Sequence, residues 1–213
     1  MRIILLLLIL STSIYGQTKL DSIFSIEFPT EPEKYEFTEK NEKAISFYSN
    51  DENESFVAMS MIKLDGETEF KNNLPNLKSL KKAYEKMIEV QIDAMRKKTF
   101  IFKDTAQIII NDFIGYKITY QDEHSGNQNA ESILLLINGI NFVATYSKVN
   151  EFNENNKNIF FNSIKIDTSK KPKQLAEPYD LKENLLELFF KLIFAIGLFY
   201  LWRKYKKTTG NNS

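Results

Sequence analysis

The sequence has 213 residues, with 28 basic and 28 acidic side chains, no cysteine and a single histidine, His124. This composition excludes disulfide scaffolds, thiol nucleophiles, thiolate metal sites and sites built from several histidines. The charge is segregated, because residues 17–180 carry 21 basic and 26 acidic residues, whereas residues 181–213 carry six basic and two acidic ones. An acidic middle argues against nucleic acid as a partner, since phosphate contacts need a basic surface.

The first residues have the pattern of a secretory signal peptide. Arg2 precedes an eight-residue apolar run at 3–10, and the exit region ends at the small residue Gly16, although Ile14, third from the cut, is not small. Eight helical residues extend over about 12 Å, which is too short for a hydrocarbon core of about 30 Å. We therefore expect residues 1–16 to be a signal peptide that is cut between Gly16 and Gln17. The alternative is a buried N-terminal strand or helix.

Alternation of apolar and polar residues predicts strands along the following segment. The predicted strands are residues 24–28, which Pro29 stops, 44–49 and 55–64, which flank a polar loop, 114–120, 133–137 and 140–146. The last two are joined by Asn138-Gly139, and Asn-Gly between two apolar runs is the strongest short hairpin signal. Hairpins therefore dominate the predicted strand pairing.

Two helices interrupt and follow these strands. The longer one has a face of spaced, largely apolar residues opposite its lysines: Leu77, Leu80, Tyr84, Met87, Gln91 and Met95. A shorter helix is expected at 150–161, followed by a short strand. Residues 17–167 are therefore predicted to form one α+β domain with a mostly antiparallel sheet flanked by helices.

The order of elements, with one long helix in the middle and short sequence stretches on either side, resembles the PsbP-like family, which includes an extrinsic photosystem subunit and related bacterial envelope proteins. The stretches are FSIEFP near the start, the ILLLINGINFVATYS hairpin and FFNSIKI near the end. The resemblance covers about residues 22–166 and implies an α/β/α sandwich. Relatives often have Gly-Trp soon after the first proline, whereas Thr30-Glu31-Pro32 stands here. Members mostly bind or support other proteins, and no shared catalytic set maps onto this chain.

Residues 168–180, with two prolines and three lysines, are predicted to be a linker before a transmembrane helix at 181–202. The apolar run at 185–202 would extend over about 27 Å as a helix. Its charges, Glu187 and Lys191, can pair four residues apart, and the lysine can reach back to the head groups. The residues assigned to this anchor are Leu185, Glu187, Lys191, Gly197 and Trp202. The alternative is a buried or surface amphipathic helix.

Basic residues follow the anchor directly: Arg203, Lys204, Lys206 and Lys207. By the positive-inside rule they stop transfer and place the tail, residues 203–213, in the cytoplasm. The chain is therefore expected to be a single-pass protein of the cell membrane. Its domain would lie outside the cytoplasm, in the periplasm if the cell is Gram-negative.

Candidate chemistry is sparse. His124 stands between Asp122 and Ser125, but three neighbours on one polar loop lack the rigid support that a catalytic triad needs. Asp51, Glu52 and Glu54 suggest calcium, although they lack the glycine-centred spacing of an EF-hand loop, and a solvated turn is the preferred interpretation. We assign no catalytic, cofactor-binding or metal-binding residue and no cofactor.

The resulting hypothesis is a membrane-anchored, extracytoplasmic binding or assembly module rather than an enzyme. Its expected partners are the membrane and another envelope protein. The alternatives are a small-ligand carrier and an anchored hydrolase with an unidentified carboxylate site. The sequence does not identify a ligand.

The signal-peptide assignment makes a direct prediction. N-terminal sequencing of the protein purified from its native host should begin at Gln17, because signal peptidase cuts after the small residue that ends the exit region. A protein that retains Met1 would contradict the assignment.

Overall fold

The structure is a computed structural model, and it describes residues 16–39, 42–51, 53–63, 74–148 and 151–176. The described residues belong to one compact unit, which ends at Ala176. The predicted transmembrane helix at 181–202 and the tail at 203–213 lie outside the described residues, as do residues 1–15. Within the described ranges, no helix combines the length and the apolar character needed to cross a membrane.

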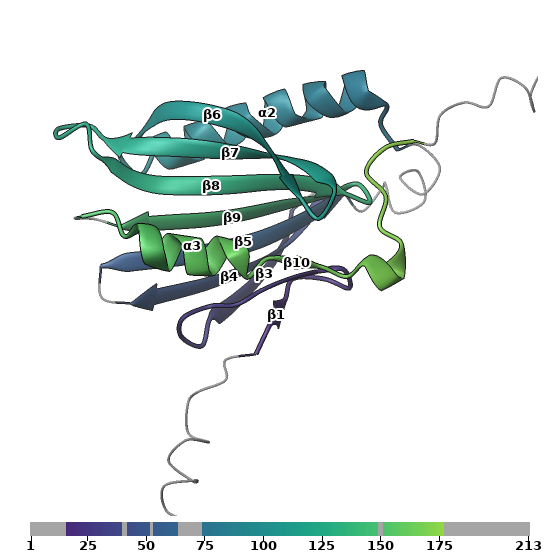
Figure 1. Cartoon of the computed structure of the whole chain (residues 1–213), viewed down its shortest axis with the longest axis horizontal. Helices are drawn as coiled ribbons and strands as arrows, with labels where there is room; N and C mark the ends of the chain where they lie inside the picture. The colour runs from purple at the N-terminus through teal and green to yellow at the C-terminus, as the bar shows by residue number, and fades with distance from the viewer. Residues whose placement is uncertain (1–15, 40–41, 52, 64–73, 149–150, 177–213) are drawn as a thin grey trace, which may run out of the picture. The chain divides into compact units, whose positions relative to one another are not determined.

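A seven-stranded sheet forms the centre of the domain, in the order β3-β4-β5-β9-β8-β7-β6, with antiparallel pairing throughout (Figure 1). Its strands are β3 (Glu33–Glu39), β4 (Glu42–Asp51), β5 (Glu54–Lys63), β6 (Phe100–Ile110), β7 (Phe113–Asp122), β8 (Gln128–Ile137) and β9 (Ile140–Lys148). A small second sheet has the order β1-β2-β10, formed by β1 (Thr18–Lys19), β2 (Phe24–Ile26) and β10 (Lys165–Ile166). The predicted α+β class with a mostly antiparallel sheet is confirmed.

The predicted hairpins are confirmed as well. Strands β4 and β5 pair around their polar loop, and β8 and β9 pair around Asn138-Gly139. Both turn residues have a positive φ, 52° at Asn138 and 74° at Gly139. Asparagine and glycine tolerate this conformation better than other residues, which is why they occur in tight hairpin turns.

Strands β3 and β6 were not predicted. Every residue of β3 is exposed, so its sequence has no buried face that would give an alternating pattern. Strand β6 is mostly exposed, and its register shifts between Phe102 and Asp104. Such a bulge interrupts the period of two on which strand prediction relies.

Helix α2 (Leu77–Arg96) covers one face of the sheet. Its first turn is capped by Asn76, whose side chain accepts a hydrogen bond from the backbone N–H of Ser79 at 2.9 Å. Leu80 and Tyr84 are buried on its inner side. They pack with sheet residues that share this face: Ile118, Tyr120, Leu134, Leu136 and Val143.

Helix α3 (Glu154–Asn162) covers the opposite face (Figure 1). Asn153 caps it by accepting a hydrogen bond from the N–H of Asn156 at 3.1 Å. Phe160 and Phe161 pack into the larger core cluster with residues of both sheets: Phe24, Ile26, Phe28, Phe56, Ile133, Leu135, Phe142 and Tyr146. The domain therefore has a helix on each face of its central sheet.

Two side chains replace part of the ladder between β7 and β8, whose pairing ends at Gly115 and Leu135. The Tyr84 hydroxyl donates to the carbonyl of Ile114 at 2.5 Å and accepts from the N–H of Leu136 at 2.9 Å. The Gln174 side-chain amide donates to the carbonyl of Ile114 at 2.7 Å and to that of Leu136 at 3.1 Å. It accepts from the N–H of Ile114 at 2.9 Å. The separated strand ends therefore keep their hydrogen bonds.

Gln174 belongs to the segment 168–180, which was predicted to be a linker. A short 3₁₀ helix, η2 (Thr168–Lys170), begins this segment. Asn138 and Lys173 then exchange two hydrogen bonds, and the N–H of Ala176 donates to the carbonyl of Pro75 at 3.0 Å. Residues 168–176 therefore contact the domain, and residues 177–180 lie outside the described chain.

Replacement of Tyr84 by Phe tests the side-chain ladder. The change leaves the buried N–H of Leu136 without its partner, and an unsatisfied buried group costs about 1–3 kcal/mol. Urea unfolding of residues 17–176 should show that loss in the free energy of unfolding. Tyr116→Phe is the matched control, because its hydroxyl makes a single exposed bond, 3.4 Å long, to Gln107. Equal losses in the two variants would contradict this assignment.

Candidate functional site

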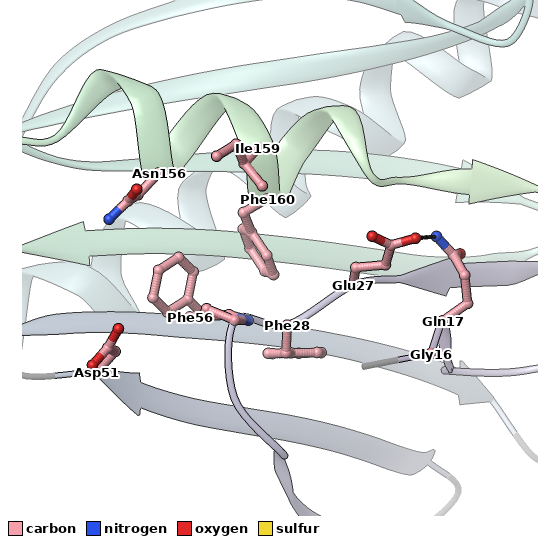
Figure 2. Close-up of a pocket in the computed structure, with 10 residues that line it drawn as sticks. Gly16, Gln17, Glu27, Phe28, Asp51, Phe56, Asn156, Ile159 and Phe160 are labelled. Atoms are coloured by element: carbon pink, nitrogen blue, oxygen red, sulfur yellow. Dashed lines mark hydrogen bonds between the residues drawn. The ribbon is translucent and has the colours of Figure 1, made fainter. Parts of the chain in front are cut away.

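A cleft of about 610 Å³ lies between α3, the segment around β2 and the β4–β5 hairpin (Figure 2). Its volume is within the range of about 300–1,000 Å³ that is typical of ligand sites. The lining residues come from three distant parts of the chain: Gly16, Gln17, Glu27, Phe28, Pro29, Asp51, Phe56, Asn156, Ile159 and Phe160.

Three phenylalanines form the inner surface of this cleft. The ring of Phe160 meets the ring of Phe28 edge-on with centroids 5.4 Å apart, and that of Phe56 at 5.2 Å. All three side chains are buried. Edge-to-face rings in a packed core hold fixed orientations, so this inner surface is preformed.

The outer parts of the cleft are acidic. Glu27 accepts a hydrogen bond from the side chain of Gln17 at 2.8 Å and lies 3.7 Å from the ammonium of Lys165. The Asp51 side chain has no hydrogen-bond or ion-pair partner among the described residues. The described lining contains no lysine or arginine. The cleft therefore has acidic groups at its outer parts and buried aromatic side chains at its base.

The two acidic groups do not converge. Figure 2 shows Glu27 and Asp51 at opposite ends of the cleft, with the phenylalanine side chains between them. A glycosidase-type mechanism needs two carboxyl groups on either side of one reacting bond. The separation of Glu27 and Asp51 does not fit this requirement.

Behind the cleft, Asn156 connects the lining to a buried polar cluster around Glu54. The Glu54 carboxylate accepts hydrogen bonds from Asn156 at 2.7 Å, from the hydroxyl of Tyr146 at 3.0 Å and from the ammonium of Lys148 at 2.9 Å. Burial opposes ionisation, but the hydrogen bonds from these three partners outweigh it and hold the pKa of Glu54 below its ordinary value. Burial, followed by the neighbouring carboxylate, raises the pKa of Tyr146.

A second buried carboxylate, Glu131, lies on the same face of the sheet. It is 3.7 Å from the ammonium of Lys157 in α3 and 3.8 Å from that of Lys117 in β7. Lys157 also contacts Glu154 at 2.5 Å. These contacts compensate the buried charges, and such pairs fix the position of α3 over the sheet.

The loop that holds His124 forms a turn around Asp122. The Asp122 carboxylate accepts bonds from the backbone N–H groups of His124 and Ser125, at 3.0 Å and 2.8 Å, and from the Ser125 hydroxyl at 3.0 Å. These bonds lower the pKa of Asp122 and hold the turn. A catalytic triad would require the carboxylate to bond the ring of His124. Here the Asp122 carboxylate bonds the backbone N–H of His124 instead.

The acidic residues considered for calcium are separated by the fold. Glu54 is committed to its three donors, Asp51 lies at the cleft, and Glu52 is outside the described residues. Across the part of the chain that the structure describes, no group of three or more His, Cys, Asp or Glu side chains is arranged to hold a metal ion.

The residues of the predicted signal cleavage lie at the edge of the fold. Gln17 is bound to the domain, because its side chain donates to Glu27 and to the carbonyl of Ser163 and accepts from the Ser25 hydroxyl at 2.6 Å. Gly16 is exposed, with nothing near the position of a side chain. The predicted anchor residues and the basic stop residues lie outside the described chain.

Sequence reasoning missed the cleft. Two of its polar members, Glu27 and Asn156, stand in a predicted strand and a predicted helix, but nothing in the spacing links them. Only the packing of α3 against Phe28 and Phe56 brings these segments together.

Comparison with known proteins adds no family assignment. No family model and no curated protein sequence matches this chain. Among solved structures, a crystal structure of a protein from Bacteroides thetaiotaomicron VPI-5482 matches with a TM-score of 0.30 and 10% identity, over 71% of this chain. The match spans 48% of that protein, which is about half its length. At this level the likeness carries no argument, and the PsbP-like family stays a prediction.

The lowered pKa of Glu54 predicts a pH dependence of stability. A folded-state pKa below the unfolded value contributes stability that is complete above the ordinary value of 4.5 and is lost as the pH falls through the folded pKa. Glu54→Gln should therefore be less stable than the wild type at neutral pH, and the difference should shrink on acidification. The free energy of unfolding of residues 17–176, measured between about pH 7 and about pH 3, tests this.

Glu123→Gln is the control, since Glu123 is exposed in the Asp122 turn. This variant should follow the wild type at every pH. A constant difference between Glu54→Gln and the wild type over the whole range would contradict the assignment.

Proposed function

We propose that this chain is a membrane-anchored binding module with its folded domain outside the cytoplasm, and that the cleft beside α3 receives a basic side chain of another envelope protein. The observation that carries the proposal is the combination of a preformed aromatic surface with an acidic rim. Asp51 has no partner among the described residues, so its charge is available to a ligand.

The chemistry of the cleft favours arginine or lysine as the group that enters. A guanidinium or ammonium group that enters can pair with a carboxylate at the rim of the cleft. Arginine is also among the residues that contribute most to protein interfaces. Its aliphatic stem can lie against Phe28 and Ile159 while its head reaches Asp51 or Glu27.

The position of the domain within the chain supports export and anchoring. Gln17, directly after the predicted cleavage point, is hydrogen-bonded to the domain at its start, and the N–H of Ala176 donates to the carbonyl of Pro75 near its end. The predicted anchor at 181–202 begins five residues later in the sequence. A signal peptide and an anchor at these positions would leave the whole folded unit intact and tethered.

The finer fold assignment belongs to the same proposal. A PsbP-like protein is expected to be an α/β/α sandwich, and α2 and α3 pack on opposite faces of the antiparallel sheet. Members of that family mostly bind or support other proteins, which agrees with a binding module.

A small-ligand carrier is the second candidate. The volume of the cleft, about 610 Å³, favours it, because this is the size of sites for small molecules. A carrier would hold a small organic cation in the same place. For a hydrolase, the separation of Glu27 and Asp51 in Figure 2 offers no support.

Site-specific photocrosslinking in the native host tests the proposal. The full chain with a photoreactive residue at Ile159, in the cleft, should give a discrete protein adduct in membranes that resist carbonate washing. The same residue at Ile109, on the edge strand β6, is the control, because both side chains are 61% exposed. Adding Asp51→Lys to the Ile159 variant should reduce the adduct several-fold.

Three outcomes would contradict the proposal. They are equal adducts from both positions, no change with Asp51→Lys, and a chain that carbonate releases from membranes. A small-molecule adduct at Ile159 without a protein adduct would favour the carrier instead.

A further inference from the structure

We propose that a second groove, between α2 and strands β6 and β7, binds a long-chain carboxylate, with its acyl chain in the groove and its head group between Lys78 and Lys81. The groove has a volume of about 510 Å³. It lies on the sheet face opposite α3, so the proposal does not depend on the function of the cleft.

The inner surface of the groove is apolar and fixed. Leu80, Tyr84, Ile114 and Tyr116 line it, and the rings of the two tyrosines are 4.8 Å apart. Helix α2 and the β7 strand hold these residues in place, so the surface is formed before any ligand arrives. Leu77, which also lines the groove, is 63% exposed although it is a large apolar side chain.

The two tyrosine hydroxyls do not change this apolar character. The Tyr84 hydroxyl is bound to Ile114, Leu136 and Gln174, and that of Tyr116 to Gln107. Their rings, rather than new hydrogen-bond donors, therefore face the groove. A ligand segment that lies here gains by burying apolar surface.

The charge at the groove is positive. Lys78 and Lys81 line it, three residues apart on one side of α2, and neither has an ion-pair partner among the described residues. The described lining contains no acidic residue, and the first turn of α2 contains none either. The positive end of the helix dipole adds to the field of the two ammonium groups.

An apolar groove beside two lysines without an ion-pair partner among the described residues is complementary to an anionic amphiphile. Residues three apart on a helix have side chains about 5–6 Å from each other, which suits one small anionic head between two ammonium groups. Lysine stems can also cover the first part of the acyl chain while their heads stay in water. A free long-chain carboxylate meets both requirements.

The test uses the full chain in phosphatidylcholine nanodiscs with a diazirine-bearing hexadecanoate as the probe. On illumination, the label should map to peptides that contain residues 77–84 and 107–116. Unlabelled hexadecanoate should compete with it, whereas hexadecanol, which has the same chain without the charge, should compete poorly.

Charge reversal and filling of the groove give independent variants. Lys78→Glu with Lys81→Glu should weaken labelling about tenfold, since two ion pairs are lost and repulsion replaces them. Lys82→Glu is the control, because this lysine is on the same helix but does not line the groove. Gln107→Trp, which fills the groove without changing the charge, should also weaken labelling. Circular dichroism checks that each variant is folded.

Equal labelling of the double lysine variant and the Lys82 control would overturn the proposal, and so would competition by hexadecanol as strong as that by hexadecanoate. Labelling that persists in Gln107→Trp would overturn the placement in the groove. Competition by nanodiscs that contain phosphatidylglycerol, at the strength of free hexadecanoate, would overturn the assignment to a free carboxylate in favour of a membrane lipid.

Discussion

The whole domain depends on strand β8 being covered on both faces. Its residues are buried without interruption from Asn129 to Ile137, so neither set of alternating side chains meets water. Each face needs its own apolar cover, and α2 and α3 supply it. One hollow lies beside each helix, the acidic cleft beside α3 and the basic groove beside α2.

Two networks of hydrogen bonds satisfy many of the buried polar groups of the domain. Tyr84 and Gln174 complete the ladder where β7 and β8 separate, and Glu54 is compensated by Lys148, Tyr146 and Asn156. Buried networks of this kind are costly to break, because removing one partner leaves another buried polar group without a hydrogen bond. They therefore also fix the surfaces beside them: the Tyr84 ring lines the groove, and Asn156 lines the cleft.

Patterns in short stretches of sequence predicted the elements whose structure depends mainly on neighbouring residues. The apolar spacing of α2 and the Asn138-Gly139 turn are two examples, because a helix period and a tight turn are determined by residues close together in the sequence. By contrast, β3 has no buried face, and the segment around Gln174 resembles a linker in composition, because its role is to bond strand ends that are distant in sequence. The cleft could not be predicted for the same reason. The residues that line it come together only when α3 packs on Phe28 and Phe56, and no pattern within a short stretch of sequence indicates that contact.

The order of the strands has a consequence for how the chain reaches this state. Strand β5 pairs with β9, and Glu54 and Lys148 are neighbours although 94 residues separate them. Closing such a long loop costs entropy before any contact repays it, so folding that depends on distant pairs is slow. The final segments, β10 and Gln174, bond to β2 and β7, so the small sheet and the hydrogen bonds of Gln174 cannot form until nearly all of the domain has been synthesised. If the chain is exported as proposed, this delay would keep it unfolded while it is threaded through a narrow translocation channel.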